Sequence, residues 1–171
     1  MAQFFSYSVK TRLDRQAVWQ LLADIQNWSS ISRVYEDLGW SGEPWSIGSS
    51  ITGKLKYPVA VPFQYLLRDV KPARLVRYLA HGSEIGFATE QTISFERFSN
   101  STLIHVDAYA VGICNCSIVG GTLGFLKSLT ESWFSEFARV CDDEAILRQV
   151  STHGVWSVLP HRLGRIVRTS W

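Results

Sequence analysis

The sequence has little cysteine, no long apolar run and almost no net charge, and each shortage excludes a class of protein. Three cysteines leave one unpaired in any disulfide scheme, and no apolar run approaches the roughly 20 residues needed to cross a bilayer. The chain also does not open with a signal-type segment. We therefore expect a soluble, cytoplasmic protein whose cysteines stay reduced.

Motifs for metal, phosphate or hydrolytic chemistry are lacking too. Cys114-Asn115-Cys116 has no second ligand pair, so it does not read as a zinc site. The sequence holds no metal-binding histidine pair, no Gly-rich phosphate loop and no G-x-S-x-G motif. We accordingly predict a protein that uses neither a metal nor a cofactor.

The small net charge of +2 is unevenly distributed along the chain. The charged residues of segment 151–171 are Arg162, Arg165 and Arg168, which give this tail +3 and leave −1 on the rest. The body therefore lacks the basic surface that binds nucleic acid. Apolar residues alternate with the arginines in the tail, which could cover a cavity mouth, pack on a dimer partner or another protein, or contact an anionic membrane.

Aromatic side chains, in contrast, are abundant: seven Trp, six Tyr and nine Phe in 171 residues. Hydrophobic residues make up 46% of the chain, which is long enough for one domain with a substantial core. Aromatic rings bury a large apolar area with few rotatable bonds. They suit either a thick core or an aromatic-lined pocket.

Two helical patterns bracket a region of strands. Asp14 is placed to cap a first helix, whose apolar stripe is Val18, Leu21, Leu22 and Ile25. A second, much longer amphipathic pattern runs from about residue 122 to 150. Period-two alternation predicts seven strands, at residues 3–11, 34–40, 50–57, 63–70, 75–80, 84–96 and 102–110.

The order of these elements resembles the helix-grip fold of the START/SRPBCC superfamily, and within it the polyketide cyclase/dehydrase and lipid-transport branch. Several short blocks carry the resemblance by their order and spacing. They are Val18-Trp19-Gln20-Leu21-Leu22-Ala23-Asp24 with Asn27-Trp28, then Gly48, then Asp69-Val70-Lys71-Pro72-Ala73-Arg74-Leu75, and finally Ile93-Ser94-Phe95-Glu96 with Ser101-Thr102-Leu103-Ile104.

The resemblance implies an α+β fold in which a seven-stranded antiparallel sheet curves around one long C-terminal helix and encloses an apolar cavity. Residues 1–150 would form this helix-grip ligand-binding domain, and residues 151–171 a basic-apolar extension outside the family pattern. On the strand registers above, the residues that line the cavity would include Tyr57, Phe87, Thr89, Gln91, Phe95, Trp133 and Phe137.

Four polar residues are candidates for chemistry in such a cavity: Glu36, Arg68, His81 and Gln91. Glu36 would face the cavity if its strand is regular, whereas a one-residue bulge would turn it outward. Arg68 has the same ambiguity of register. His81 ends a strand at a possible cavity rim, where it could act as an acid or base.

Three functions remain open on the sequence. The first is binding of an apolar small molecule, such as a polyketide, a lipid or another metabolite. The second is a cofactor-free cyclase or dehydrase that confines a polyketide-like substrate and uses one or two polar groups. The third is a subunit that docks on a protein or membrane through residues 151–171, with a homodimer as one alternative. Deletion of the residues after Val150 would abolish only the third.

Overall fold

A computed structural model describes residues 2–32, 34–56, 60–82, 88–111 and 118–143 of the chain. Within these ranges it has seven strands, two α-helices of nine or more residues and two short helical turns. In chain order these are β1 (Ala2–Thr11), α1 (Arg15–Ala23), η1 (Ile25–Asn27), α2 (Trp28–Ile31), β2 (Tyr35–Ser41), β3 (Ser50–Lys56), β4 (Ala60–Lys71), β5 (Leu75–Gly82), β6 (Ala88–Phe98), β7 (Ser101–Val111) and α3 (Ile118–Cys141).

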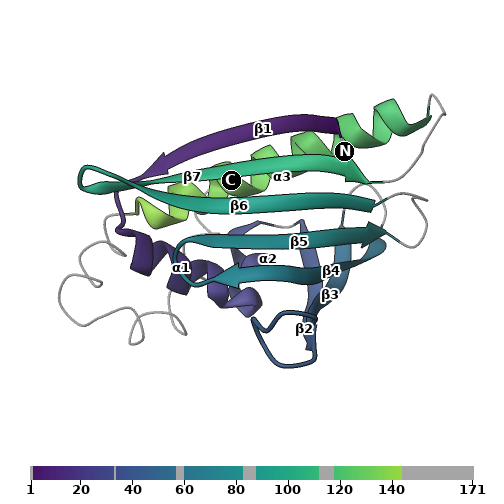
Figure 1. Ribbon diagram of the computed structural model, residues 1–171, viewed down its shortest axis with the longest axis horizontal. Coiled ribbons are helices and arrows are strands. Elements are labelled where there is room, and N and C mark those ends of the chain that lie inside the picture. The colour runs from purple at the N-terminus through teal and green to yellow at the C-terminus, as the bar shows by residue number, and fades with distance from the viewer. Residues whose placement is uncertain (1, 33, 57–59, 83–87, 112–117, 144–171) are drawn as a thin grey trace.

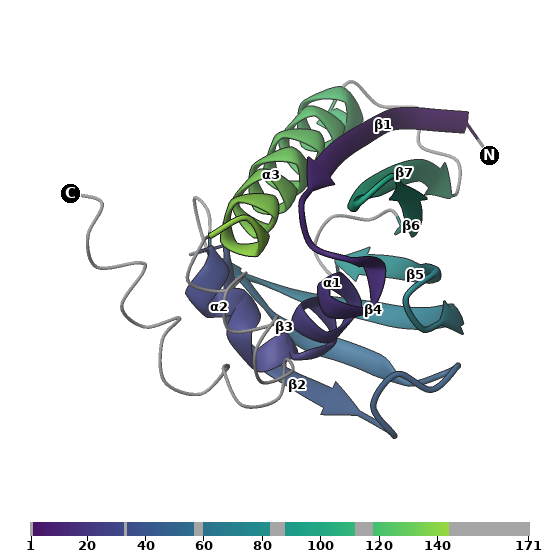
Figure 2. The ribbon, with the colours of Figure 1, turned by 90° about the vertical axis from the view of Figure 1, so that its left-hand side faces the viewer.

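The seven strands form one antiparallel sheet in the order β1-β7-β6-β5-β4-β3-β2 (Figure 1). Strands β2 to β7 pair with their neighbours in sequence, and β1 adds to the free edge of β7. The predicted meander and the number of strands are thus confirmed. Figure 2 shows that the sheet is strongly curved, with α3 and the shorter helices on its inner side.

The first helix begins where the sequence predicts. The Asp14 carboxylate accepts the backbone N–H groups of Gln16 and Ala17 at 2.8 and 2.9 Å, which satisfies two donors that a helix start leaves unpaired. Val18 and Leu22 on the inner face of α1 are fully buried. Helix α1 therefore packs its apolar stripe onto the core, as its spacing requires.

The long helix α3 occupies Ile118–Cys141 and therefore ends before the predicted residue 150; residues 144–150 of the predicted helix lie outside the described residues. The reason lies in Asp142. Its carboxylate accepts the Thr11 hydroxyl at 2.8 Å and the Arg12 backbone N–H at 2.7 Å, while its carbonyl accepts the Arg12 guanidinium at 2.7 Å. These three bonds tie the chain to the end of β1 and stop the helix there. An amphipathic pattern carries no trace of such a long-range contact.

Strand β2 contains an irregularity that sets the facing of its residues. The pairing with β3 shifts between Glu36 and Gly39, and Asp37 has a φ of 53°. Before this bulge, Tyr35 pairs with the buried Leu55 and is itself buried. Glu36, the next residue along the strand, therefore lies on the opposite, outer face of the sheet.

The inner face of the sheet and the inner face of α3 share one continuous core. Its most deeply buried side chains include Leu67, Ile104 and Val106 from the sheet and Phe137 from α3. None of the described helices is both long enough and apolar enough to span a bilayer.

Candidate ligand-binding pocket

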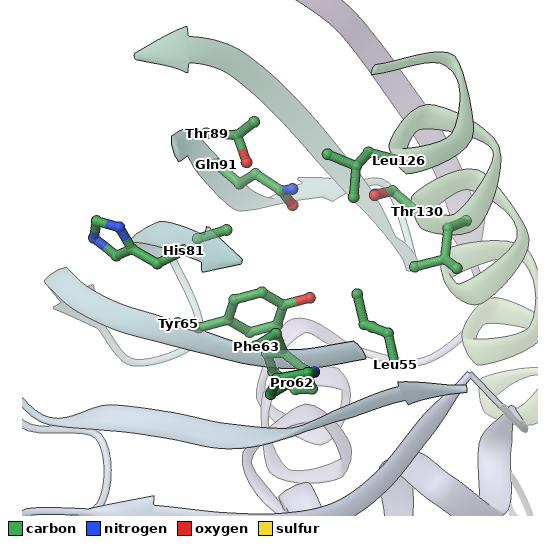
Figure 3. A pocket seen from close by; sticks show the side chains of 11 residues that line it. Leu55, Pro62, Phe63, Tyr65, His81, Thr89, Gln91, Leu126 and Thr130 are labelled. Carbon is green, nitrogen blue, oxygen red and sulfur yellow. The ribbon is translucent and has the colours of Figure 1, made fainter. Parts of the chain in front are cut away.

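A pocket lies between α3 and strands β3 to β6, at the end of the sheet where β5 stops and β6 starts (Figure 3). Its free volume is about 30 Å³, enough for a water molecule or two but not for a drug-sized ligand. The described residues that line it are Leu55, Pro62, Phe63, Tyr65, Ala80, His81, Thr89, Gln91, Leu126, Leu129 and Thr130.

Strand pairing brings the polar part of this lining together. Ala80 pairs with Thr89 and Tyr78 pairs with Gln91 across β5 and β6, and because side chains alternate along a strand all four face inward. The Tyr78 hydroxyl donates to the Gln91 side-chain carbonyl at 2.7 Å. Thr89 and Gln91 are 2% and 4% exposed, so their polar groups lie in an apolar environment.

Three buried tyrosines lie at or next to the pocket, and of these Tyr65 lines it. The hydroxyls of Tyr35 and Tyr65 lie 3.2 Å apart, and the rings of Tyr65 and Tyr78 lie 4.6 Å apart between centroids. Burial raises the pKa of Tyr35 to about 12, and it raises the pKa values of Tyr65 and Tyr78 well above the ordinary value. All three phenols therefore stay protonated at physiological pH, where they act as hydrogen-bond donors and not as bases.

Aromatic packing explains why the pocket is small. Trp133 of α3 stacks on Phe137 with centroids 5.2 Å apart, and it also contacts Trp28 at 5.3 Å and Tyr35 at 5.9 Å. Phe63 contacts both Tyr35 and Tyr65, at 5.5 and 4.4 Å. These rings fill the space between α3 and the sheet next to the pocket.

The predicted lining residues have three different outcomes. Thr89 and Gln91 line the pocket. Phe95, Trp133 and Phe137 are buried but are not among the residues that line it; Phe95, for example, packs against Trp19 of α1 at 6.3 Å. The two other predicted residues, Tyr57 and Phe87, lie outside the described residues.

The candidates for acid–base chemistry, other than Gln91, do not project into the pocket. Glu36 pairs across the strands with Lys54, an exposed residue on the outer face, and the bulge after it accounts for this orientation. Arg68 has an exposed side chain. His81 is exposed at the pocket rim, and in Figure 3 its imidazole points away from the interior.

Sequence reasoning predicted a contribution from α3 but missed the turns of that helix that line the pocket, and it missed β4. Leu126, Leu129 and Thr130 belong to an earlier turn of α3 than Trp133, and Phe63 and Tyr65 belong to β4. The alternation of Phe63, Tyr65 and Leu67 was visible in the sequence. Its facing becomes certain only when β4 is paired with β3 and β5. The described part of the chain brings no three His, Cys, Asp or Glu side chains close enough to hold a metal ion.

Comparisons with known proteins rest on structure alone. No protein-family model matches the sequence, and neither does any curated protein. Among solved structures, Ara h 8.0201 is similar with a TM-score of 0.69 and 8% identity, over 80% of this chain and 95% of that one. A START superfamily protein from Mycobacterium smegmatis has a TM-score of 0.54 and 15% identity, over 77% and 96% of the two chains.

A third similar structure is DynU16, from the dynemicin biosynthetic locus, with a TM-score of 0.56 and 15% identity; the match covers 78% of this chain and 45% of DynU16. The chain has the helix-grip fold that these structures share. At these identities the likeness concerns the backbone only. What the pocket of this helix-grip protein binds has to be argued from its own side chains.

Proposed function

We propose that this protein binds a hydrophobic small molecule between α3 and strands β3 to β6, in a site that widens from the present pocket of about 30 Å³ as the surrounding side chains move apart. The observation that carries the proposal is the composition of the pocket: a mainly apolar wall that holds a few buried, neutral hydrogen-bonding groups. Leu55, Leu126 and Leu129 supply the apolar part, and Gln91 and Tyr65 supply the polar part (Figure 3). Such a wall stabilises an apolar ligand by excluding water and orients it by one or two hydrogen bonds.

Binding is better supported than acid–base catalysis. A cyclase or dehydrase would use a proton donor or acceptor inside the cavity. Of the described residues that line the pocket, His81 turns its ring outward and Tyr65 has a pKa that burial raises well above its usual value. A cyclase at this site would therefore have to act through confinement and hydrogen bonds from Gln91 and Tyr65.

A fluorescence titration tests the proposal. The probe is N-phenyl-1-naphthylamine, a neutral compound that becomes fluorescent in apolar surroundings. Ala80 lines the pocket, so Ala80→Leu places a larger alkyl group in a space of about 30 Å³. We expect the dissociation constant to rise by about tenfold or more, which corresponds to a loss of roughly 1.4 kcal/mol.

The matched control is Arg68→Ala, which truncates an exposed side chain of β4 away from the pocket lining. It should leave the dissociation constant unchanged within about twofold, since single exposed substitutions change free energies by less than about 0.5 kcal/mol. Equal weakening by both variants, or no binding by the native protein, would refute the proposed site.

A further inference from the structure

The indole N–H of Trp133 is a buried donor without an acceptor among the described residues. Trp133 is 3% exposed, and within the described ranges its Nε1 has no hydrogen-bond partner. Two other tryptophans show what the fold ordinarily does with this group: the indole N–H of Trp28 donates to the Leu22 carbonyl at 2.9 Å, and that of Trp45 donates to the Ala23 carbonyl at 2.9 Å. Leaving a buried donor unpaired is unfavourable, and nearly all buried polar groups in native proteins are paired.

A second buried donor without an acceptor belongs to the hydroxyls of Tyr35 and Tyr65, next to Trp133. The hydroxyls of Tyr35 and Tyr65 share one hydrogen bond of 3.2 Å, which is long for two hydroxyl oxygens. Each phenol carries one hydrogen, so one of the two hydrogens has no acceptor among the described residues. Among the described residues, the Trp133 indole N–H and one phenolic hydrogen of the Tyr35 and Tyr65 pair are thus buried donors without an acceptor.

These donors adjoin the pocket. Leu129 lines it, and Trp133 follows Leu129 by one turn on the same face of α3. The ring of Tyr35 contacts the ring of Trp133, with centroids 5.9 Å apart, and the ring of the pocket residue Phe63, with centroids 5.5 Å apart. Tyr35 therefore contacts both the pocket wall and the ring that carries the unpaired indole N–H.

We propose that the ligand is a neutral, ring-containing ketone whose carbonyl oxygen accepts the Trp133 indole N–H and the spare phenolic hydrogen of the Tyr35 and Tyr65 pair. This inference rests on the proposed function and narrows its ligand class. A ketone oxygen has two lone pairs and no hydrogen, so it complements two donors at once. To reach them, the ligand extends from the pocket past the Tyr35 ring toward α3.

The residues that line the pocket also indicate the charge of the ligand. Apart from His81, whose ring points outward, the described pocket residues are uncharged at neutral pH. A carboxylate in this space would lose its hydration without gaining a cation, which is strongly unfavourable. The site therefore favours a neutral carbonyl over a fatty acid or another carboxylate.

Nuclear magnetic resonance of the ¹⁵N-labelled protein tests the inference directly. The seven tryptophans give seven indole N–H signals, and Trp133→Phe identifies the one that belongs to Trp133. The probes are 1-indanone and indane, which share one ring skeleton and differ in the carbonyl group. Backbone signals of Thr89 and Gln91 report whether a probe enters the pocket.

We expect both probes to shift the signals of Thr89 and Gln91, and only 1-indanone to move the Trp133 indole proton downfield, as a new hydrogen bond requires. The indole signals of Trp28 and Trp45, which already have acceptors, should move little. Trp133→Phe should reduce the preference for 1-indanone over indane by roughly two- to tenfold, the worth of one net hydrogen bond.

The outcomes separate this inference from the function on which it rests. If both probes shift Thr89 and Gln91 while the Trp133 signal stays in place, the ketone inference is wrong and the binding pocket stands. If neither probe shifts any pocket signal, both fail. An equal shift of Trp133 by indane and 1-indanone would also overturn the inference, because it would show a ring-current effect without a hydrogen bond.

Discussion

Replacing Tyr78 by Phe removes one hydroxyl from the buried hydrogen bond at the pocket and leaves the Gln91 carbonyl without its donor. Tyr78 is 7% exposed and Gln91 4%, and their bond is 2.7 Å long. An unpaired buried carbonyl costs about 1–3 kcal/mol. Because the adjoining pocket of about 30 Å³ can admit a water molecule to Gln91, we expect the lower half of this range, about 1–2 kcal/mol.

A double variant makes the reasoning specific. Tyr78→Phe combined with Gln91→Met removes both partners and replaces them with apolar groups of similar shape, which is close to neutral for a buried pair. The double variant should therefore be more stable than Tyr78→Phe alone. The control is Tyr109→Phe, the same change on the outer face of β7 opposite Glu90, which should cost less than about 0.5 kcal/mol.

Urea denaturation followed by circular dichroism gives the free energy of unfolding of each variant. The slope with urea should not change, since the variants expose the same surface on unfolding. In a thermal melt, about 1–2 kcal/mol corresponds to a fall in Tm of roughly 2–8 °C for a chain of this size. If the double variant loses the sum of its two single variants, Tyr78 and Gln91 do not act as a bonded pair.

Two further predictions concern the helix cap and the buried phenols. Asp14→Ala should lower the free energy of unfolding by about 0.5–2 kcal/mol and Asp14→Asn by much less, because Asn also caps helices; equal losses in urea denaturation would contradict the capping role. Burial raises the pKa of Tyr35 to about 12, so above roughly pH 10 the unfolded chain releases a proton that the native protein keeps. Stability should hold below pH 10 and fall from there toward pH 12, and urea denaturation of Tyr35→Phe should show a shallower fall than the native protein.

Local sequence patterns predict most of the fold because the elements here are regular. Period-two alternation places all seven strands, and the Asp14 cap with its apolar stripe places α1. Both signals depend on neighbours close in sequence, so they survive without knowledge of the tertiary structure. The C-terminal end of α3 was not predicted correctly, because Asp142 binds Thr11 and Arg12, which lie some 130 residues away in the chain.

The pocket was harder to predict than the strands for a similar reason. The inward facing of Thr89 and Gln91 follows from alternation within β6. Tyr35 could not be found in this way, since the bulge after Glu36 changes the facing of residues within β2. Which turn of α3 lies over the pocket depends on how the helix docks on the sheet. The helical pattern alone therefore could not show that Leu126 and Leu129 line the pocket, or how Trp133 and Phe137 lie relative to it.

The aromatic filling of the core leads to a last prediction, on ligand shape. Any ligand larger than the pocket must separate rings that now touch, such as Tyr35 and Phe63 at 5.5 Å, and each such pair contributes about 0.5–1.5 kcal/mol beyond its buried area. A ligand with its own ring can replace these contacts, whereas a flexible chain cannot and also loses conformational entropy. We therefore expect 1-indanone to bind more tightly than 2-nonanone, a linear ketone with the same number of carbon atoms. Tighter binding of 2-nonanone in a calorimetric titration would contradict this reasoning, because it would show that the site prefers linear chains to rings.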